Sequence, residues 1–298
     1  MIVFKEYVDD LRQKFLPLAT ILEEKEIQYG WQFTLQRNGE KAVVKAYYNK
    51  KNQFHVTWPA TQNQLVWDLQ RQLGAATGTD RKDFKEIWAG SDESGKGDFF
   101  GPLVVAAVVV RRSLANDLLM AGVKDCKQLT DKKVLELEPL IKEKAVSYRV
   151  LELRPEYYNR RYSQVKNLNT LNASGHFHAL AQVLQETPEA EGALIDQFMQ
   201  DTSLIRELQK QFPQKKFLQR PMGEEDTAVA AASVLARAQF LHTMEQLAAE
   251  AGEQELPKGS GPLQAAVAKR IAAQLGRDVL PKFVKTHFVT YKNLFVEQ

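Results

Sequence analysis

The segment GSDESGKGDFFGP, residues 90–102, decides how this chain is interpreted. It joins two β-rich runs, 87–91 and 103–110, and carries the adjacent acids Asp92 and Glu93 followed by a Gly-Lys-Gly triplet. Two carboxylates at a strand end repel each other strongly in a partly buried site unless a cation neutralises them. The segment therefore predicts a divalent metal site, and Mg²⁺ is the ion that favours such oxygen ligands.

A phosphate-binding P-loop is the alternative, because Gly90, Gly95 and Lys96 fit its G-x-x-x-x-G-K frame and Asp196 could act as the second acidic motif. That frame needs a serine or threonine after the lysine, where this chain has Gly97. It also needs a helix at that point, whereas a β-rich run follows. The metal site is therefore the preferred interpretation.

The remaining pattern divides the chain in two. Residues 3–16 and 65–73 have helical spacing, and between them the runs 31–35, 41–48 and 54–58 have the alternation of a three-strand meander. Residues 74–82, GAATGTDRK, are small and polar and are typical of a linker. We therefore expect an N-terminal substrate-binding domain over 1–75, a linker over 76–83 and a catalytic domain over 84–298.

The second part has the pattern of a mixed α/β domain. Runs 87–91, 103–110 and 148–153 predict central strands, 193–195 and 216–219 predict further strands, and the alanine-rich stretch 227–249 predicts a helix. Residues 257–262 predict a loop before a last helical stretch.

Composition sets broad limits on the class of protein. With 44% hydrophobic and 26% charged residues the chain has the balance of a globular protein, and no apolar run is long enough for a membrane span. A single cysteine, Cys126, cannot form an internal disulfide and is expected to be a packing residue. The net charge of +3 permits a nucleic-acid partner. We expect a cytoplasmic monomer with no obligate protein partner.

The segment around Asp92, Glu93, Gly95, Lys96 and Gly97 resembles the opening motif of the type 2 ribonucleases H. Three later segments resemble that family in the same order. Residues 123–129 are similar to its Asp-Ser-Lys-Lys-Leu motif with Cys126 and Gln128 as departures, Asp196 stands at its third carboxylate, and 229–237 is similar to the helix after the fourth.

Within that family the chain resembles ribonuclease HIII through its N-terminal domain, Lys96 between the glycines, and Glu224 in place of an aspartate. Segments 167–172 and 285–288 are similar as well. The resemblance implies an α/β fold: a ribonuclease H-like catalytic domain, with a mixed sheet flanked by helices, preceded by a small α+β domain like the TATA-binding protein.

The resemblance also implies an activity, the hydrolysis of the RNA strand of RNA–DNA hybrids by two-metal-ion in-line cleavage, giving 5′-phosphate and 3′-hydroxyl ends. It implies two Mg²⁺ ions, with Mn²⁺ as an alternative, held by the catalytic acids Asp92, Glu93, Asp196 and Glu224. The substrate contacts that we expect are Ser94, Gly95, Lys96, Gly97 and Lys127.

Three assignments keep an alternative. Glu225 competes with Glu224 as fourth carboxylate, because the register to the following helix is about one residue short. Lys41, Lys45, Lys50 and Lys51, with Tyr47, Tyr48 and Trp58 nearby, predict a basic sheet face for nucleic acid, although such lysines are by default a solvated edge. The whole chain could also be a catalytically silent nucleic-acid-binding protein. His176, His178 and His287 are interpreted as surface or packing residues without a functional role.

Overall fold

The computed structural model describes residues 2–48, 54–59, 64–73, 83–196, 202–220 and 223–295. The chain forms two compact units, Met1–Asp80 and Arg81–Gln298. Apart from Asp83, the expected linker over 76–83 lies outside the described residues.

The first unit is an antiparallel sheet with two helices packed on it. Its elements are α1 (Ile2–Phe15), β1 (Thr20–Ile27), β2 (Gly30–Arg37), β3 (Glu40–Tyr48), β4 (Phe54–Thr57) and α2 (Gln64–Gln72), and the strands lie in the order β1-β2-β3-β4. The expected meander therefore has a fourth strand, β1, which the sequence did not reveal. Its sequence, TILEEKEI, is charged and mostly exposed at the edge of the sheet, so it lacks the alternation of a half-buried strand.

The two faces of this sheet differ. Phe33, Leu35 and Val44 point to one face and pack with Leu11 and Leu69 of the two helices, where they form the core of the unit. On β3 the alternate residues, Lys41 through Tyr47, point the other way and are exposed or half-buried. One face is thus a hydrophobic core and the other carries polar side chains.

The second unit is a mixed sheet of five strands. Its strands are β5 (Ile87–Ser94), β6 (Leu103–Arg111), β7 (Ser147–Leu153), β8 (Gly192–Asp196) and β9 (Lys216–Arg220), in the order β7-β6-β5-β8-β9. Strands β5, β8 and β9 are parallel, and β6 is antiparallel to β5 and β7. Each of these strands was expected, but β7 lies at an edge of the sheet rather than in its centre, and β8 is interior.

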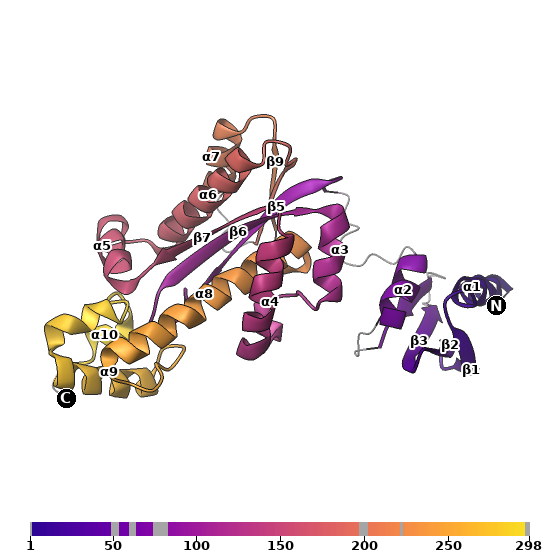
Figure 1. Ribbon diagram of the computed structural model, residues 1–298, viewed down its shortest axis with the longest axis horizontal. Coiled ribbons are helices and arrows are strands. Elements are labelled where there is room, and N and C mark those ends of the chain that lie inside the picture. The colour runs from indigo at the N-terminus through magenta and orange to yellow at the C-terminus, as the bar shows by residue number, and fades with distance from the viewer. Residues whose placement is uncertain are drawn as a thin grey trace. The chain divides into compact units, whose positions relative to one another are not determined.

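Helices cover both faces of this sheet (Figure 1). One face carries α3 (Arg112–Met120), α4 (Asp131–Lys144), α8 (Thr227–Ala251) and α9 (Pro262–Leu275), and the other carries α6 (Leu168–Glu186) and α7 (Ser203–Gln211). The remaining elements are α5 (Pro155–Val165), α10 (Val289–Lys292) and the short 3-10 helices η1 (Cys126–Gln128), η2 (Gly223–Glu225) and η3 (Arg277–Lys282). The predicted fold class, a ribonuclease H-like α/β domain preceded by a small α+β domain, is confirmed.

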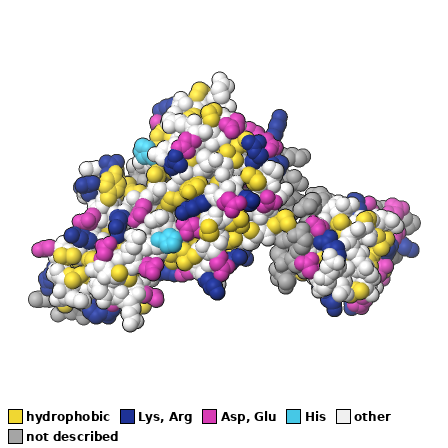
Figure 2. All heavy atoms as spheres, in the orientation of Figure 1, with side chains coloured by type: hydrophobic (Ala, Val, Ile, Leu, Met, Phe, Trp, Pro, Cys, Tyr) yellow, Lys and Arg dark blue, Asp and Glu magenta, His cyan; other side chains and the backbone are white. Residues whose placement is uncertain are grey.

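Within the described ranges, no helix combines the length and the apolar character that a membrane crossing requires. Lys and Arg side chains are interspersed with Asp and Glu over the face shown in Figure 2, as the modest net charge of +3 leads one to expect. The overall surface charge therefore does not identify a binding site, and the charged groups of individual cavities must be considered instead.

Candidate active site

The topology brings the carboxyl ends of β5 and β8 to one edge of the sheet. These strands are parallel neighbours with Ser91 opposite Ile195, so the residues that follow, Asp92 and Asp196, come to the same level. Two acids separated by more than a hundred residues in sequence are thus adjacent because of strand order alone.

A cavity of about 440 Å³ opens at this edge. Eight of the predicted site residues line it: Asp92, Glu93, Ser94, Gly95, Lys96, Gly97, Lys127 and Asp196. Residues that the sequence interpretation did not include, among them Asp131 and Arg237, line it too. Asp131 forms an ion pair of 3.1 Å with Arg237. The guanidinium group of Arg237 therefore lines the cavity with its charge partly balanced by Asp131.

The electrostatics of the cavity favour a cation. Asp92 is buried, and its Oδ1 accepts a hydrogen bond of 2.8 Å from the main-chain N–H of Glu93. Burial raises the pKa of Asp92 well above its ordinary value, the charges of Glu93 and Asp196 raise it further, and the charge of Lys127 opposes them. A buried acid that resists ionisation and lies beside two further carboxylates fits a site for a divalent ion, which would supply the missing positive charge.

The fourth acid is only partly located. The main-chain N–H of Gly223 donates a hydrogen bond of 2.9 Å to Asp196 Oδ1, so the turn η2 lies directly against the third acid. The side chain of Glu224 lies outside the described part of the structure, and Glu225 is exposed. Asp226 is committed elsewhere, since it caps α8 and accepts a hydrogen bond of 3.0 Å from Trp88 Nε1. Among the described side chains, no three acids, histidines or cysteines are grouped closely enough to hold an ion.

The glycine loop after Glu93 has a conformation that requires glycine. Gly95 has a φ of +84°, and a Cβ there would lie 2.2 Å from the carbonyl oxygen of Pro102. At Gly97 a Cβ would meet nothing within 4 Å, so the main chain there borders open space. Strand β6 follows this loop, and the helix that a P-loop needs is absent from the described residues 95–111. The P-loop alternative is therefore wrong.

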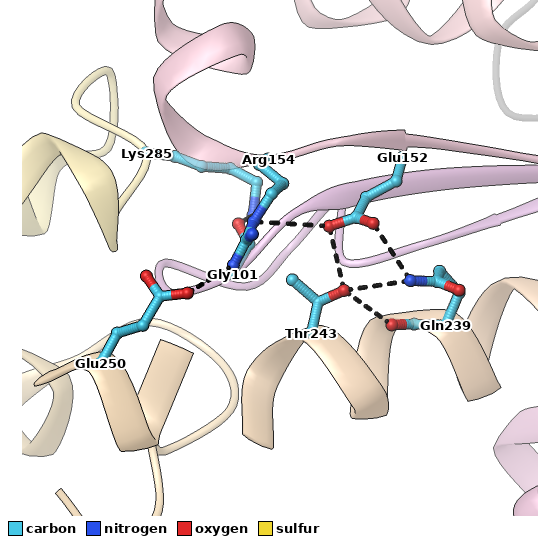
Figure 3. Close-up of polar contacts among 7 residues, drawn as sticks. All are labelled: Gly101, Glu152, Arg154, Gln239, Thr243, Glu250 and Lys285. Carbon is cyan, nitrogen blue, oxygen red and sulfur yellow. Dashed lines mark hydrogen bonds and ion pairs between the residues drawn. The ribbon is translucent and has the colours of Figure 1, made fainter. Parts of the chain in front are cut away.

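Lys285 holds the far side of this loop. It is fully buried, and its Nζ donates to the carbonyl oxygens of Asp98 at 2.8 Å and Gly101 at 2.7 Å (Figure 3). The main chain of Phe99 makes two hydrogen bonds of 2.9 Å. Its N–H donates to the carbonyl oxygen of Gly259, and its carbonyl oxygen accepts from the N–H of Lys285. The loop is thus shaped by segments far away in the sequence.

Cys126 and Lys127 enter the cavity from η1. The N–H of Cys126 donates a hydrogen bond of 3.1 Å to Ser233 Oγ of α8, and this bond fixes the turn η1. Burial raises the pKa of the Cys126 thiol to about 11, and the charge of Asp92 raises it as well. The thiol therefore stays protonated at neutral pH, which agrees with the interpretation that Cys126 is not a nucleophile.

One residue at the site was missed. His176 of α6 is fully buried, with Nε2 lying 3.0 Å from Glu93 Oε2 and Nδ1 lying 2.8 Å from Ser91 Oγ. The sequence interpretation gave His176 no role, and helical spacing alone carried no signal of this contact with Glu93. His178 is exposed and His287 stacks on Tyr162 at 4.2 Å, as surface and packing residues should.

Comparison with known proteins agrees with this geometry. The family model described as Ribonuclease HII matches residues 89–291. Ribonuclease HIII of Chlamydia pneumoniae is 39% identical over 207 residues, 69% of this chain and 69% of that protein, and ribonuclease HIII of Bacillus mycoides is 37% identical over 69% of this chain and 67% of that protein. The crystal structure of Bst-RNase HIII in complex with Mn²⁺ has a TM-score of 0.67 and 28% identity, and the similarity covers 97% of this chain and 95% of that one. The chain belongs to the type 2 ribonuclease H family, in its ribonuclease HIII branch.

Proposed function

We propose that this ribonuclease H is an endonuclease that hydrolyses the RNA strand of RNA–DNA hybrids with the help of divalent metal ions. In-line attack on the phosphodiester would leave a 5′ phosphate and a 3′ hydroxyl. The observation that carries the proposal is that Asp92, Glu93 and Asp196 line one cavity together with the glycine loop Gly95–Gly97.

The donor set fits Mg²⁺ or Mn²⁺. Asp92, Glu93, Asp196 and Glu224 would hold the ions, since carboxylate oxygens are their preferred ligands and the raised pKa of Asp92 marks a shortage of positive charge. The chemistry that a pair of such ions would supply here is activation of the attacking water and stabilisation of the leaving 3′ oxygen. The protein's own part is to fix these carboxylates on the ends of two neighbouring strands.

The glycine loop is suited to recognising the ribose of the RNA strand. The 2′-hydroxyl is what distinguishes RNA from DNA, and glycine lets main-chain donors and acceptors approach it. Gly95 and Gly97 would supply these groups beside Ser94, while Lys96 and Lys127 would contact phosphate. Lys96 Nζ lies 3.3 Å from Glu93 Oε1 and therefore already points into the acidic part of the site.

The first unit would extend the surface of the protein that binds the duplex. Lys41 and Lys45 lie on the face of β3 opposite the helices, and Tyr47 on that face stacks on His55 at a ring separation of 5.6 Å. Tyr48 and Trp58 do not join it, because Tyr48 packs on Phe4 and Trp58 packs against the core. Lys50 and Lys51 lie outside the described residues.

The test is cleavage of a labelled hybrid with and without Mg²⁺. Asp92→Asn should lower kcat far beyond the roughly 100-fold that loss of an outer partner costs, while hybrid binding stays nearly intact because phosphate contacts supply most of the affinity. Asp117→Asn is the matched control, with the same loss of charge on an exposed site of α3.

Two outcomes would contradict the proposal. Cleavage by Asp92→Asn within a few-fold of the wild type would remove this acid from the chemistry. A wild type that binds the hybrid in Mg²⁺ and leaves it intact would favour the silent binding protein.

A further inference from the structure

The second acid of the site is connected to a buried polar chain that the proposed chemistry does not explain. Ser91 Oγ lies 2.8 Å from His176 Nδ1, and His176 Nε2 lies 3.0 Å from Glu93 Oε2. Ser91 and His176 are fully buried, so neither is a solvated surface group. A buried polar chain that ends on a catalytic acid has the arrangement of an orienting device.

We infer that His176, whose ring is held between Ser91 and Glu93, is a positioning residue that holds the Glu93 carboxylate in its working orientation. The inference rests on the proposed function, because it takes Glu93 as a ligand or substrate contact. It goes beyond that function by assigning a role to a residue outside the acidic set.

The packing of α6 makes this contact possible. A Cβ on Gly175 would lie 2.7 Å from Val105 Cγ2, so the helix approaches β6 more closely than any larger residue would permit. Because Val105 pairs with Glu93 in the sheet, that close approach occurs at the level of the acid. His176 follows Gly175 directly and thereby reaches Glu93 from the covered face of the sheet.

The hydrogen bonds fix the tautomer. An ionised carboxylate only accepts, so His176 Nε2 must carry the proton that it donates to Glu93 Oε2. In a neutral ring Nδ1 is then an acceptor, and the Ser91 hydroxyl donates to it. Glu93 therefore selects the Nε2–H form, and the Ser91 hydroxyl, which can donate or accept, holds the ring in place.

The two oxygens of Glu93 are consequently used differently. Oε2 is bonded into the fold by His176, and Oε1 lies 3.3 Å from Lys96 Nζ on the cavity side. His176 therefore anchors one oxygen of Glu93 to the fold, while the other oxygen and Lys96 line the cavity together.

Asn172, one helical turn before His176, supports the same function. It is fully buried, and within the described parts of the chain neither its Oδ1 nor its Nδ2 has a hydrogen-bond partner. Asn172 nevertheless lies close enough to Glu93 to act on its carboxylate, so its buried amide is a second polar group of α6 beside this acid.

The first experiment reads the tautomer directly. Nitrogen-15 NMR of the histidine rings in the full-length protein should show a proton on His176 Nε2, and Glu93→Gln, whose amide can donate as well as accept, should produce a mixture of tautomers. A wild-type His176 that carries its proton on Nδ1 would overturn the inference.

The second experiment reads the consequence. His176→Ala should weaken Mn²⁺ binding, measured by calorimetry, and lower kcat, each by about 10- to 100-fold, with little change in KM. His176→Gln keeps a donor and should recover part of both losses. His178→Ala, two residues on and exposed, is the control and should change neither.

A purely structural role has a different signature. It predicts a lower melting temperature for His176→Ala with Mn²⁺ affinity and kcat within about twofold of the wild type well below that temperature. If His176→Ala does not fold, Ser91→Ala decides, since loss of the bond that holds the His176 ring must lower Mn²⁺ affinity and kcat by a few-fold. Failure of the wild type to cleave hybrids would instead refute the proposed function and leave the tautomer measurement valid.

Discussion

The two sheets of this protein are covered differently. Helices pack on both faces of the five-stranded sheet, whereas the described helices of the first unit pack on one face of its four-stranded sheet. In the first case only the strand ends and loops can meet a substrate, and the acids are found there. In the second, the face opposite the described helices carries exposed and half-buried side chains of β3. This difference predicts chemistry at the edge of the covered sheet and broad contact on the exposed face of the first unit's sheet.

The largest expected effect concerns the edge of the covered sheet. Glu224→Gln should reduce cleavage of a hybrid in saturating Mg²⁺ by orders of magnitude if Glu224 is the fourth ligand, and Glu225→Gln should cost about 10- to 100-fold or less. Both residues lie in the turn held against Asp196, so the variants are matched in place and in charge. A dead Glu225→Gln with an active Glu224→Gln would shift the assignment by one residue.

A second, smaller effect concerns the four-stranded sheet of the first unit. Deletion of residues 1–80 should raise KM for long hybrids far more than it lowers kcat, because uniform binding away from the chemistry affects the ground and transition states alike. Affinity for a non-cleaved hybrid, measured over a salt series, would check this. Equal affinity and an equal salt slope in the intact and shortened proteins would mean that the first unit does not hold substrate.

Charge reversal sharpens that test without removing the unit. Lys41→Glu with Lys45→Glu should flatten the salt dependence of binding by roughly one unit of log slope for each lost phosphate contact. Lys5→Glu with Lys14→Glu makes the same charge change on α1, which packs on the other face of the sheet, and should leave the slope nearly unchanged. Similar slopes for the two pairs would favour the view that Lys41 and Lys45 are only a solvated edge.

The smallest effect is a pH dependence of stability confined to the covered sheet's unit. Burial, with the charges of Lys285 and Lys292, lowers the pKa of His287 to about 4. Because its pKa is higher in the unfolded chain, acid favours unfolding, and stability should fall as pH decreases from about 6.5 to about 4. His287→Phe should remove this part of the loss, on the order of 1–2 kcal/mol after allowance for partial exposure. Denaturation midpoints of both proteins between pH 7 and pH 4 would check it.

The sequence predicted the parts of this molecule that depend on local pattern. The strands of the catalytic sheet alternate or run apolar, and the acids at their ends follow directly, so Asp92 and Asp196 could be placed in advance. Strand β1 could not, because an exposed, charged edge strand owes its structure to its neighbour β2. His176 could not either, since its contact with Glu93 depends on how closely a helix packs on the sheet.

The clamp on the glycine loop has a consequence for folding. Lys285 bonds Asp98 across 187 positions of sequence, and the N–H of Gly259 bonds the Asp98 carboxylate across 161. Contacts of such separation carry a high entropic cost of chain closure and therefore form late. If the glycine loop selects ribose as proposed, that selectivity depends on segments that must dock from 161 and 187 positions away. The acids at the strand ends need only the sheet, so the acidic edge and its selectivity depend on different parts of the chain.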